Sequence, residues 1–265
     1  MGNFIKRLIS ALVLLPPVLY ILYKGSILTM LLVALVVVLC AIEYYRMAGF
    51  GVRDIIVAIP LTLLAYAVVG LGLTEQIAYI AVVVMFAGLY VLFTIKDVKG
   101  ASNKAGYLFM GVIYIGVFPA FIYLIREYNP ENGFYYLLTY LAVIWLSDTF
   151  AYFFGKSIGR HKLYEMISPK KTIEGSIGGI IGGFVGIYII GLFFGRMPSI
   201  SMLLFVGIVV NVVGQMGDLF ESMLKRDFGI KDSGNLIPGH GGMLDRVDAI
   251  ILSAPVMYIY VRFLV

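Results

Sequence analysis

The sequence predicts an all-α polytopic integral membrane protein with about nine transmembrane helices. Hydrophobic residues make up 61% of the 265 residues, charged residues only 13%, and the mean hydropathy is +0.98. Soluble globular domains carry about 25% charged and about 45–50% apolar residues, and here the deficit of charge extends along the whole chain. Cys40 is the only cysteine, so no intramolecular disulfide or cysteine-based zinc cluster can form. The soluble, disordered and disulfide-rich secreted classes are therefore excluded.

The predicted membrane spans follow from segment length, because a spanning helix needs about 20 mostly apolar residues. Nine segments qualify: 8–23, 27–42, 55–73, 77–95, 107–125, 135–154, 173–194, 200–219 and 249–265. A cleaved signal peptide is the alternative interpretation of the first segment, but no convincing small-residue cleavage site follows Tyr23.

The lysine and arginine residues predict the orientation of the spans. Sixteen of the 20 fall in loops on one side, and the other side holds only Lys24, Arg126, Arg196 and Arg262. Cytoplasmic loops carry the excess of positive charge, so we expect a cytoplasmic N-terminus and an outside C-terminus in a bacterial-type inner membrane. The longest polar stretches, 155–172 and 221–248, then become cytoplasmic loops. We divide the chain into an N-terminal scaffold, 1–134, and a C-terminal catalytic region, 135–265.

Glycines follow two adjoining faces of the seventh predicted span. Gly175, Gly179 and Gly183 alternate with a second set, Gly178, Gly182 and Gly186. Small residues at this spacing are typical of closely packed membrane helices. The pattern predicts tight helix contacts and leaves a homo-oligomer open.

Carboxylates flank the second polar stretch. Asp218 ends an apolar helix that also contains Asn211 and Gln215, and polar groups at membrane depth usually line a cavity or pair with another group. Asp245 and Asp248 are three positions apart, so a helix starting near Gly242 places both on one face. Such carboxylates suit Mg²⁺ together with substrate phosphates, although Asp245 could instead only cap the helix.

Basic residues and a glycine-rich turn lie between these carboxylates. Lys225, Arg226, Lys231 and Arg246 supply positive charge for phosphates, the alternative being ordinary cytoplasmic loop charge. Gly241 and Gly242 follow His240, and such glycines let main-chain N–H groups approach a phosphate closely. Carboxylates, cations and a glycine turn together are typical of phosphoryl or nucleotidyl transfer.

Two further positions lie outside this stretch. Lys170 and Lys171 in the other cytoplasmic loop could close the site over a phosphate, or could contact anionic lipid headgroups. Asp148 lies within the sixth span, and intramembrane acids are usually functional, the alternative being a structural pair with a lysine.

The second polar stretch resembles a family signature. The matching residues are Ser222, Leu224, Lys225, Arg226, Lys231, Asp232, Gly234, Ile237, Pro238, His240, Gly241, Gly242, Met243, Asp245, Arg246, Val247 and Asp248. They fit the signature of phosphatidate cytidylyltransferases, the CDP-diacylglycerol synthases, at every spacing. Ser147-Asp148 and the segment 168–175 are also similar to that family, so the resemblance covers roughly the C-terminal half.

The resemblance implies that CTP and phosphatidic acid react at the lipid bilayer to give CDP-diacylglycerol and pyrophosphate. It implies Mg²⁺ as the cofactor and leaves a second cation open. It implies metal ligands at Asp218, Asp245 and Asp248. With Lys225 and Arg246 these form our predicted catalytic set. The predicted substrate-binding set is Asp148, Lys170, Lys171, Arg226, Lys231, His240, Gly241 and Gly242. No nucleic-acid partner is expected; a transporter and a CTP-dependent polyprenol kinase are the alternative functions.

Overall fold

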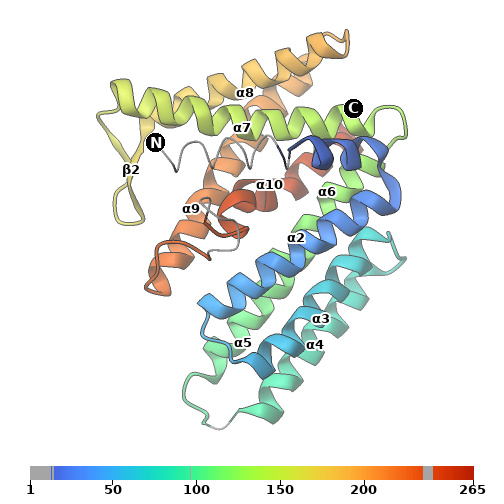
Figure 1. Ribbon diagram of the computed structural model, residues 1–265, viewed down its shortest axis with the longest axis vertical. Coiled ribbons are helices and arrows are strands. Elements are labelled where there is room, and N and C mark those ends of the chain that lie inside the picture. Colours follow the sequence, from blue (N-terminus) through green and yellow to red (C-terminus); the bar gives the residue numbers. More distant parts are fainter. Residues whose placement is uncertain (1–12, 14, 96, 235–240) are drawn as a thin grey trace. The chain divides into compact units, whose positions relative to one another are not determined.

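The structure is a computed structural model, and it describes residues 13, 15–95, 97–234 and 241–265. Most of these residues are helical (Figure 1). The chain divides into two compact units. The first comprises the described part of Met1–Tyr123 together with Asp232–Arg246, and the second comprises Leu124–Lys231 and Val247–Val265.

The first unit is a helical bundle. It contains α2 (Ser26–Met47), α3 (Val52–Gly70), α4 (Gln76–Thr94) and α5 (Ala101–Met110). Helix α5 continues through the π-helix η1 (Gly111–Val117) into α6 (Phe118–Glu127), whose residues from Leu124 onward belong to the second unit. In Figure 1, α2, α3 and α4 lie side by side. Buried tyrosine hydroxyls join neighbouring helices: Tyr45 bonds Thr62 across 2.8 Å, and Tyr66 donates to the Met30 carbonyl across 2.8 Å. Apolar helices thus gain specific contacts where lipid offers no polar partner.

The π-helix η1 ends two residues before a proline. Pro119 has no main-chain N–H, and its ring would collide with the carbonyl of Ile115 in a regular α-helix. A π-helical stretch widens the helix there and shifts its hydrogen bonds. The span therefore continues through the proline without breaking.

The second unit contains the remaining elements. They are α7 (Gly133–Ile158), strands β1 (Lys162–Tyr164) and β2 (Ser168–Thr172), α8 (Ile173–Phe193), the π-helix η2 (Met202–Val210), α9 (Asn211–Asp227) and all but the first residues of α10 (Leu244–Phe263). Figure 1 shows α7 and α8 packed side by side. The hairpin of β1 and β2 joins their ends and is antiparallel, with Lys162 opposite Thr172.

Seven of the described helices are long and apolar enough to cross a membrane, and they coincide with the second to eighth predicted spans. The first predicted span, 8–23, falls partly outside the described residues. The ninth coincides with α10, which is 20 residues long but carries Asp245, Arg246 and Asp248 near its start and Arg262 near its end. Because of these charged residues, α10 is not among the seven helices that are apolar enough to cross a membrane.

Two expectations for the polar stretches need correction. Segment 155–172 is not simply a loop, because α7 extends to Ile158 and the hairpin follows, so the fold is not strictly all-α. Segment 221–248 begins with helix, because α9 continues to Asp227. Glu221 and Lys225 stabilise this extension as an i,i+4 ion pair. Just after the end of α9, Gly229 has a φ of +71° and its N–H donates to the Arg226 carbonyl, which forms a glycine C-terminal cap.

Candidate active site

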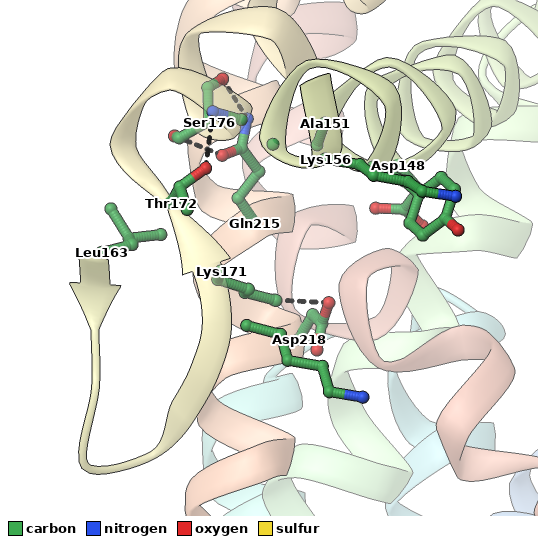
Figure 2. Close-up of a pocket in the computed structure, with 13 residues that line it drawn as sticks. Asp148, Ala151, Lys156, Leu163, Lys171, Thr172, Ser176, Gln215 and Asp218 are labelled. Atoms are coloured by element: carbon green, nitrogen blue, oxygen red, sulfur yellow. Dashed lines mark hydrogen bonds and ion pairs between the residues drawn. The ribbon is translucent and has the colours of Figure 1, made fainter. Parts of the chain in front are cut away.

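A cavity of about 560 Å³ lies within the second unit, where α7, α8, α9 and the hairpin meet (Figure 2). Its lining residues are Asp148, Ala151, Tyr152, Gly155, Lys156, Leu163, Lys170, Lys171, Thr172, Gly175, Ser176, Gln215 and Asp218. Four of them belong to the predicted site: Asp148, Lys170, Lys171 and Asp218. The cavity therefore brings together the intramembrane acid of α7, the two lysines of β2 and the acid of α9.

The central contact of the cavity is an ion pair between β2 and α9. The Lys171 ammonium lies 2.5 Å from Oδ2 of Asp218, and Figure 2 shows the lysine side chain extending from the strand toward that carboxylate. Both side chains keep about a third of their surface exposed, at 28% and 34%. The pair is therefore accessible to a ligand that enters the cavity.

Two further carboxylates interact with this pair. The charge of Asp148 interacts with Asp218 and Lys171, and Asp248 near the start of α10 interacts with all three. Asp148 faces the cavity, whereas only 9% of Asp248 is exposed. Both carboxylates are therefore within electrostatic range of the ion pair.

The hairpin that carries the lysines is anchored at its base. Glu174, in the first turn of α8, accepts hydrogen bonds from the main-chain N–H groups of Arg160 and His161, and its Oε1 lies 2.6 Å from Nδ1 of His161. The Thr172 hydroxyl accepts from the N–H of Gly175 and caps α8. These contacts fix where β2 ends, and so where Lys171 enters the cavity.

A network of amides and hydroxyls supports the apolar side of the cavity. Gln215 accepts from the Ser176 hydroxyl at 2.5 Å and donates to the side-chain oxygen of Asn211 at 3.0 Å. Asn211 also accepts from Ser147 at 2.7 Å and donates to the Gly179 carbonyl at 3.0 Å. Because Ser147, Asn211 and Gln215 come from α7 and α9 and Gly179 from α8, the network fixes the three helices that position the acids.

The glycines of α8 have the packing role that their spacing predicted. A Cβ on Gly182 would lie 2.4 Å from the carbonyl oxygen of Leu146, and one on Gly186 would lie 2.9 Å from that of Ala142. Gly183 faces the amide of Asn211, where a Cβ would come within 2.1 Å. One set of glycines thus lets α7 approach closely, while the other makes room for the amides of α9.

The basic residues of α9, and Lys231 after its end, lie beyond the cavity lining. Lys225 pairs with Glu221, which is completely buried. Arg226 lies near the carbonyls of Ile167, in the hairpin turn, and Ile230, at 3.5 and 3.4 Å. Lys231 is exposed. Lys225 is therefore held as an ion-pair partner, and Arg226 connects α9 to the hairpin.

The described signature residues between Asp232 and Arg246 belong to the first unit, whereas Val247 and Asp248 belong to the second. Oδ2 of Asp245 accepts from the N–H groups of Ser233 at 3.1 Å and Gly242 at 3.0 Å, both of which precede α10, so these two bonds hold the segment before the helix and do not cap it. The N–H of Gly242 is thus used within the protein, and Gly241 has a φ of +83°. Arg246 follows in the first turn of α10, and His240 lies outside the described residues.

The magnesium ligands stay a prediction. Among the described residues, no three His, Cys, Asp or Glu side chains are grouped so that they could hold a metal ion. Magnesium sites commonly use only one or two carboxylates and complete their coordination with water and substrate phosphates. Asp218 and Asp248, whose charges interact, fit that smaller requirement.

Sequence reasoning missed several residues at these sites. Ser176 and Tyr152 line the cavity without having been singled out, because isolated hydroxyls carry no distinctive pattern. Glu43 was also missed. It is a buried acid at the end of an otherwise apolar helix, and that placement is the signal that could have found it.

Comparison with known proteins identifies the family. The cytidylyltransferase family matches residues 5–264. A phosphatidate cytidylyltransferase of Staphylococcus epidermidis is 34% identical over 260 residues, which are 96% of this chain and 97% of that protein. Proteins of the same name from Staphylococcus haemolyticus and Staphylococcus aureus are 45% and 42% identical over 156 and 155 residues, and these alignments span 58% of each of those proteins and 58% of this chain. The chain therefore belongs to the cytidylyltransferase family.

Proposed function

We propose that this chain is a phosphatidate cytidylyltransferase, which makes CDP-diacylglycerol and pyrophosphate from CTP and phosphatidic acid. The observation that carries the proposal is the cavity at the ends of α7, α8 and α9, where lysines and carboxylates meet in a chain whose relatives bear that name. The lining also includes Ala151, Tyr152 and Leu163. A cavity with charged groups beside apolar walls suits a substrate that joins a phosphate to acyl chains.

The reaction needs charge neutralisation more than a strong base. A phosphate monoester loses its second proton at a pKa of about 6, so most phosphatidic acid is dianionic at neutral pH. A lipid phosphate oxygen attacks the α-phosphorus of CTP in line, the bond to the bridging β-phosphate oxygen breaks, and pyrophosphate leaves. Lys170 and Lys171 bind phosphate oxygens and hold the reactants in line, and Arg226, Lys231 and Arg246 supply further positive charge. His240, Gly241 and Gly242 contact a phosphate rather than supply the base.

Magnesium completes the proposed site. Asp218 and Asp248 would hold it, and the signature adds Asp245; when bound, the ion supplies positive charge to the triphosphate. The ion pair of Asp218 with Lys171 supports this assignment, because the carboxylate already has a positively charged partner. Asp148 adds negative charge beside the same pair.

The finer membrane topology is also part of the proposal. Nine spans with a cytoplasmic N-terminus and an outside C-terminus place sixteen of the 20 lysines and arginines on the cytoplasmic side. The loops that reach the cavity, including the hairpin, then lie on that side of a bacterial-type inner membrane. CTP would enter from the cytoplasm, and phosphatidic acid would enter from the bilayer.

Product analysis tests the proposed reaction. Purified protein in detergent receives phosphatidic acid and CTP labelled at either the α- or the γ-phosphate. We expect label from the α-phosphate in the lipid and label from the γ-phosphate in pyrophosphate. Lipid phosphate with CDP would identify a kinase, and the absence of any chemistry would leave a transporter; either result refutes the proposal.

Matched carboxylate variants link that activity to the cavity. Asp218→Asn should remove turnover, because it cancels the carboxylate charge that pairs with Lys171. Asp97→Asn is the control, since the Asp97 carboxylate is exposed and accepts only the main-chain N–H of Lys99 among the bonds described for it. Equal activity in the two variants would exclude the cavity as the site of reaction.

A further inference from the structure

Glu43 is a buried carboxylate in the first unit. It lies near the end of α2, in the apolar sequence that runs from Val36 to Tyr45, and only 3% of its surface is exposed. Burial of a carboxylate is costly unless hydrogen bonds compensate it. The hydrogen-bond partners of Glu43 therefore indicate the role of this buried carboxylate.

The hydrogen-bond donors to Glu43 among the described residues come from the segment that precedes and begins α10. The N–H groups of Met243 and Leu244 donate to Oε1 and Oε2, each across 2.9 Å. The hydroxyl of Ser233 donates to Oε2 across 3.1 Å. Leu244 is the first residue of α10, whose first N–H groups have no partner within the helix. Glu43 thus supplies the helix cap from a residue about 200 positions earlier in the chain.

Two glycines of the signature lie so close to this carboxylate that a side chain would collide with it. A Cβ on Gly234 would lie 2.6 Å from Oε1 of Glu43, and one on Gly242 would lie 2.7 Å from Oε2 and 1.9 Å from the Ser233 hydroxyl. Neither position can accept a side chain while Glu43 keeps its bonds. These glycines therefore serve the approach of Glu43, whatever contact they make with a phosphate.

Glu43 and Asp245 divide the donors of this segment between them. Glu43 accepts the N–H groups of residues 243 and 244, and Asp245 accepts those of Ser233 and Gly242. Loss of Glu43 would leave two main-chain donors and one hydroxyl without their buried acceptor. The main chain that carries Asp245 and Arg246 would then lose its fixed conformation.

We propose that Glu43 is a positioning residue for the reaction: from α2 it fixes the main chain around Gly234 and Gly242–Leu244, and so sets the placement of Asp245 and Arg246. The inference rests on the proposed function, in which those two residues act on the metal and the phosphates. It gives the N-terminal helices a task beyond that of a hydrophobic scaffold.

The test compares Glu43→Gln and Glu43→Ala with the control Asp54→Asn. Asp54 is also an acid of the first unit with several partners, Lys104, Tyr90 and the N–H of Gly51, but none of them belongs to the signature. We expect kcat to fall roughly 10- to 100-fold in Glu43→Ala, because buried donors lose their acceptor. Glu43→Gln, which keeps one acceptor oxygen, should lose less, the KM for CTP should change little in either variant, and Asp54→Asn should stay near the wild-type kcat.

Hydrogen exchange gives a second readout that needs no substrate. In Glu43→Ala and Glu43→Gln, the amides of Met243 and Leu244 should exchange faster, while those of α3 and α8 keep their wild-type rates. Unchanged exchange at 243–244 would overturn the inference, as would faster exchange with unchanged kcat. Equal acceleration throughout α3 would also overturn it, because it would show general destabilisation. If the wild-type protein makes no CDP-diacylglycerol, the proposed function fails, and the exchange rates alone still decide whether Glu43 orders the segment.

Discussion

The ion pair of Lys171 and Asp218 offers a direct test of the cavity. Because both side chains are partly exposed, at 28% and 34%, the pair should contribute no more than about 1 kcal/mol to the free energy of unfolding. A lysine that binds a substrate phosphate instead contributes a charge-assisted hydrogen bond of about 1.5–3 kcal/mol, which equals roughly 10- to 150-fold in kcat/KM. Lys171→Ala should therefore lose activity far more than stability.

A second lysine of the same hairpin is the matched control. The Lys162 ammonium donates to the carbonyl of Pro169 at 2.5 Å and does not line the cavity. Lys162→Ala should change thermal unfolding in detergent about as much as Lys171→Ala, but should keep kcat/KM within roughly threefold of wild type. A kcat/KM for Lys171→Ala that matches this control would refute the assignment of Lys171 to the substrate. A rise in KM for only one substrate would identify which phosphate it contacts.

Four further results are expected. Gly182→Ala brings a methyl group against a main-chain carbonyl of α7 and should cost roughly 1–3 kcal/mol of unfolding free energy, whereas Gly106→Ala enters open space and should not destabilise; thermal unfolding compares them. Asn211→Ala removes the buried acceptor of Ser147 and should lower Tm through a loss of roughly 1–3 kcal/mol. Asp245→Asn should abolish turnover while the protein still inserts, and substantial Mg²⁺-supported turnover would contradict a metal role. Chelation of divalent cations should stop wild-type turnover, and added Mg²⁺ should restore it.

The sequence predicted the helical membrane fold well because membrane helices are specified locally. Each needs only an uninterrupted apolar run of sufficient length, and the second to eighth predicted spans could be recognised without knowing their neighbours. The role of the α8 glycines was also predictable, since their spacing alone places them on adjoining faces of one helix. Segment ends were less predictable: the extension of α9 to Asp227 depends on an ion pair and a glycine cap rather than on hydropathy.

The candidate site was predicted in part, for a different reason. Asp148 and Asp218 were conspicuous because acids are rare in apolar helices, and Lys170 and Lys171 because they form part of a motif. The hairpin that brings the lysines to Asp218 depends on contacts between distant residues, such as Glu174 with His161. Glu43 lies about 200 positions from its partners, so no local pattern could have paired them.

The two sides of α8 differ in which substitutions they tolerate. On one side, Gly178, Gly182 and Gly186 cannot gain even a methyl group without displacing α7. On the other, Ile177, Ile181 and Leu192 stay 42–74% exposed and touch little of the protein. Substitutions that adapt this helix to bilayers of different thickness or fluidity are therefore confined to its outward side chains. The inward surface must keep its glycines.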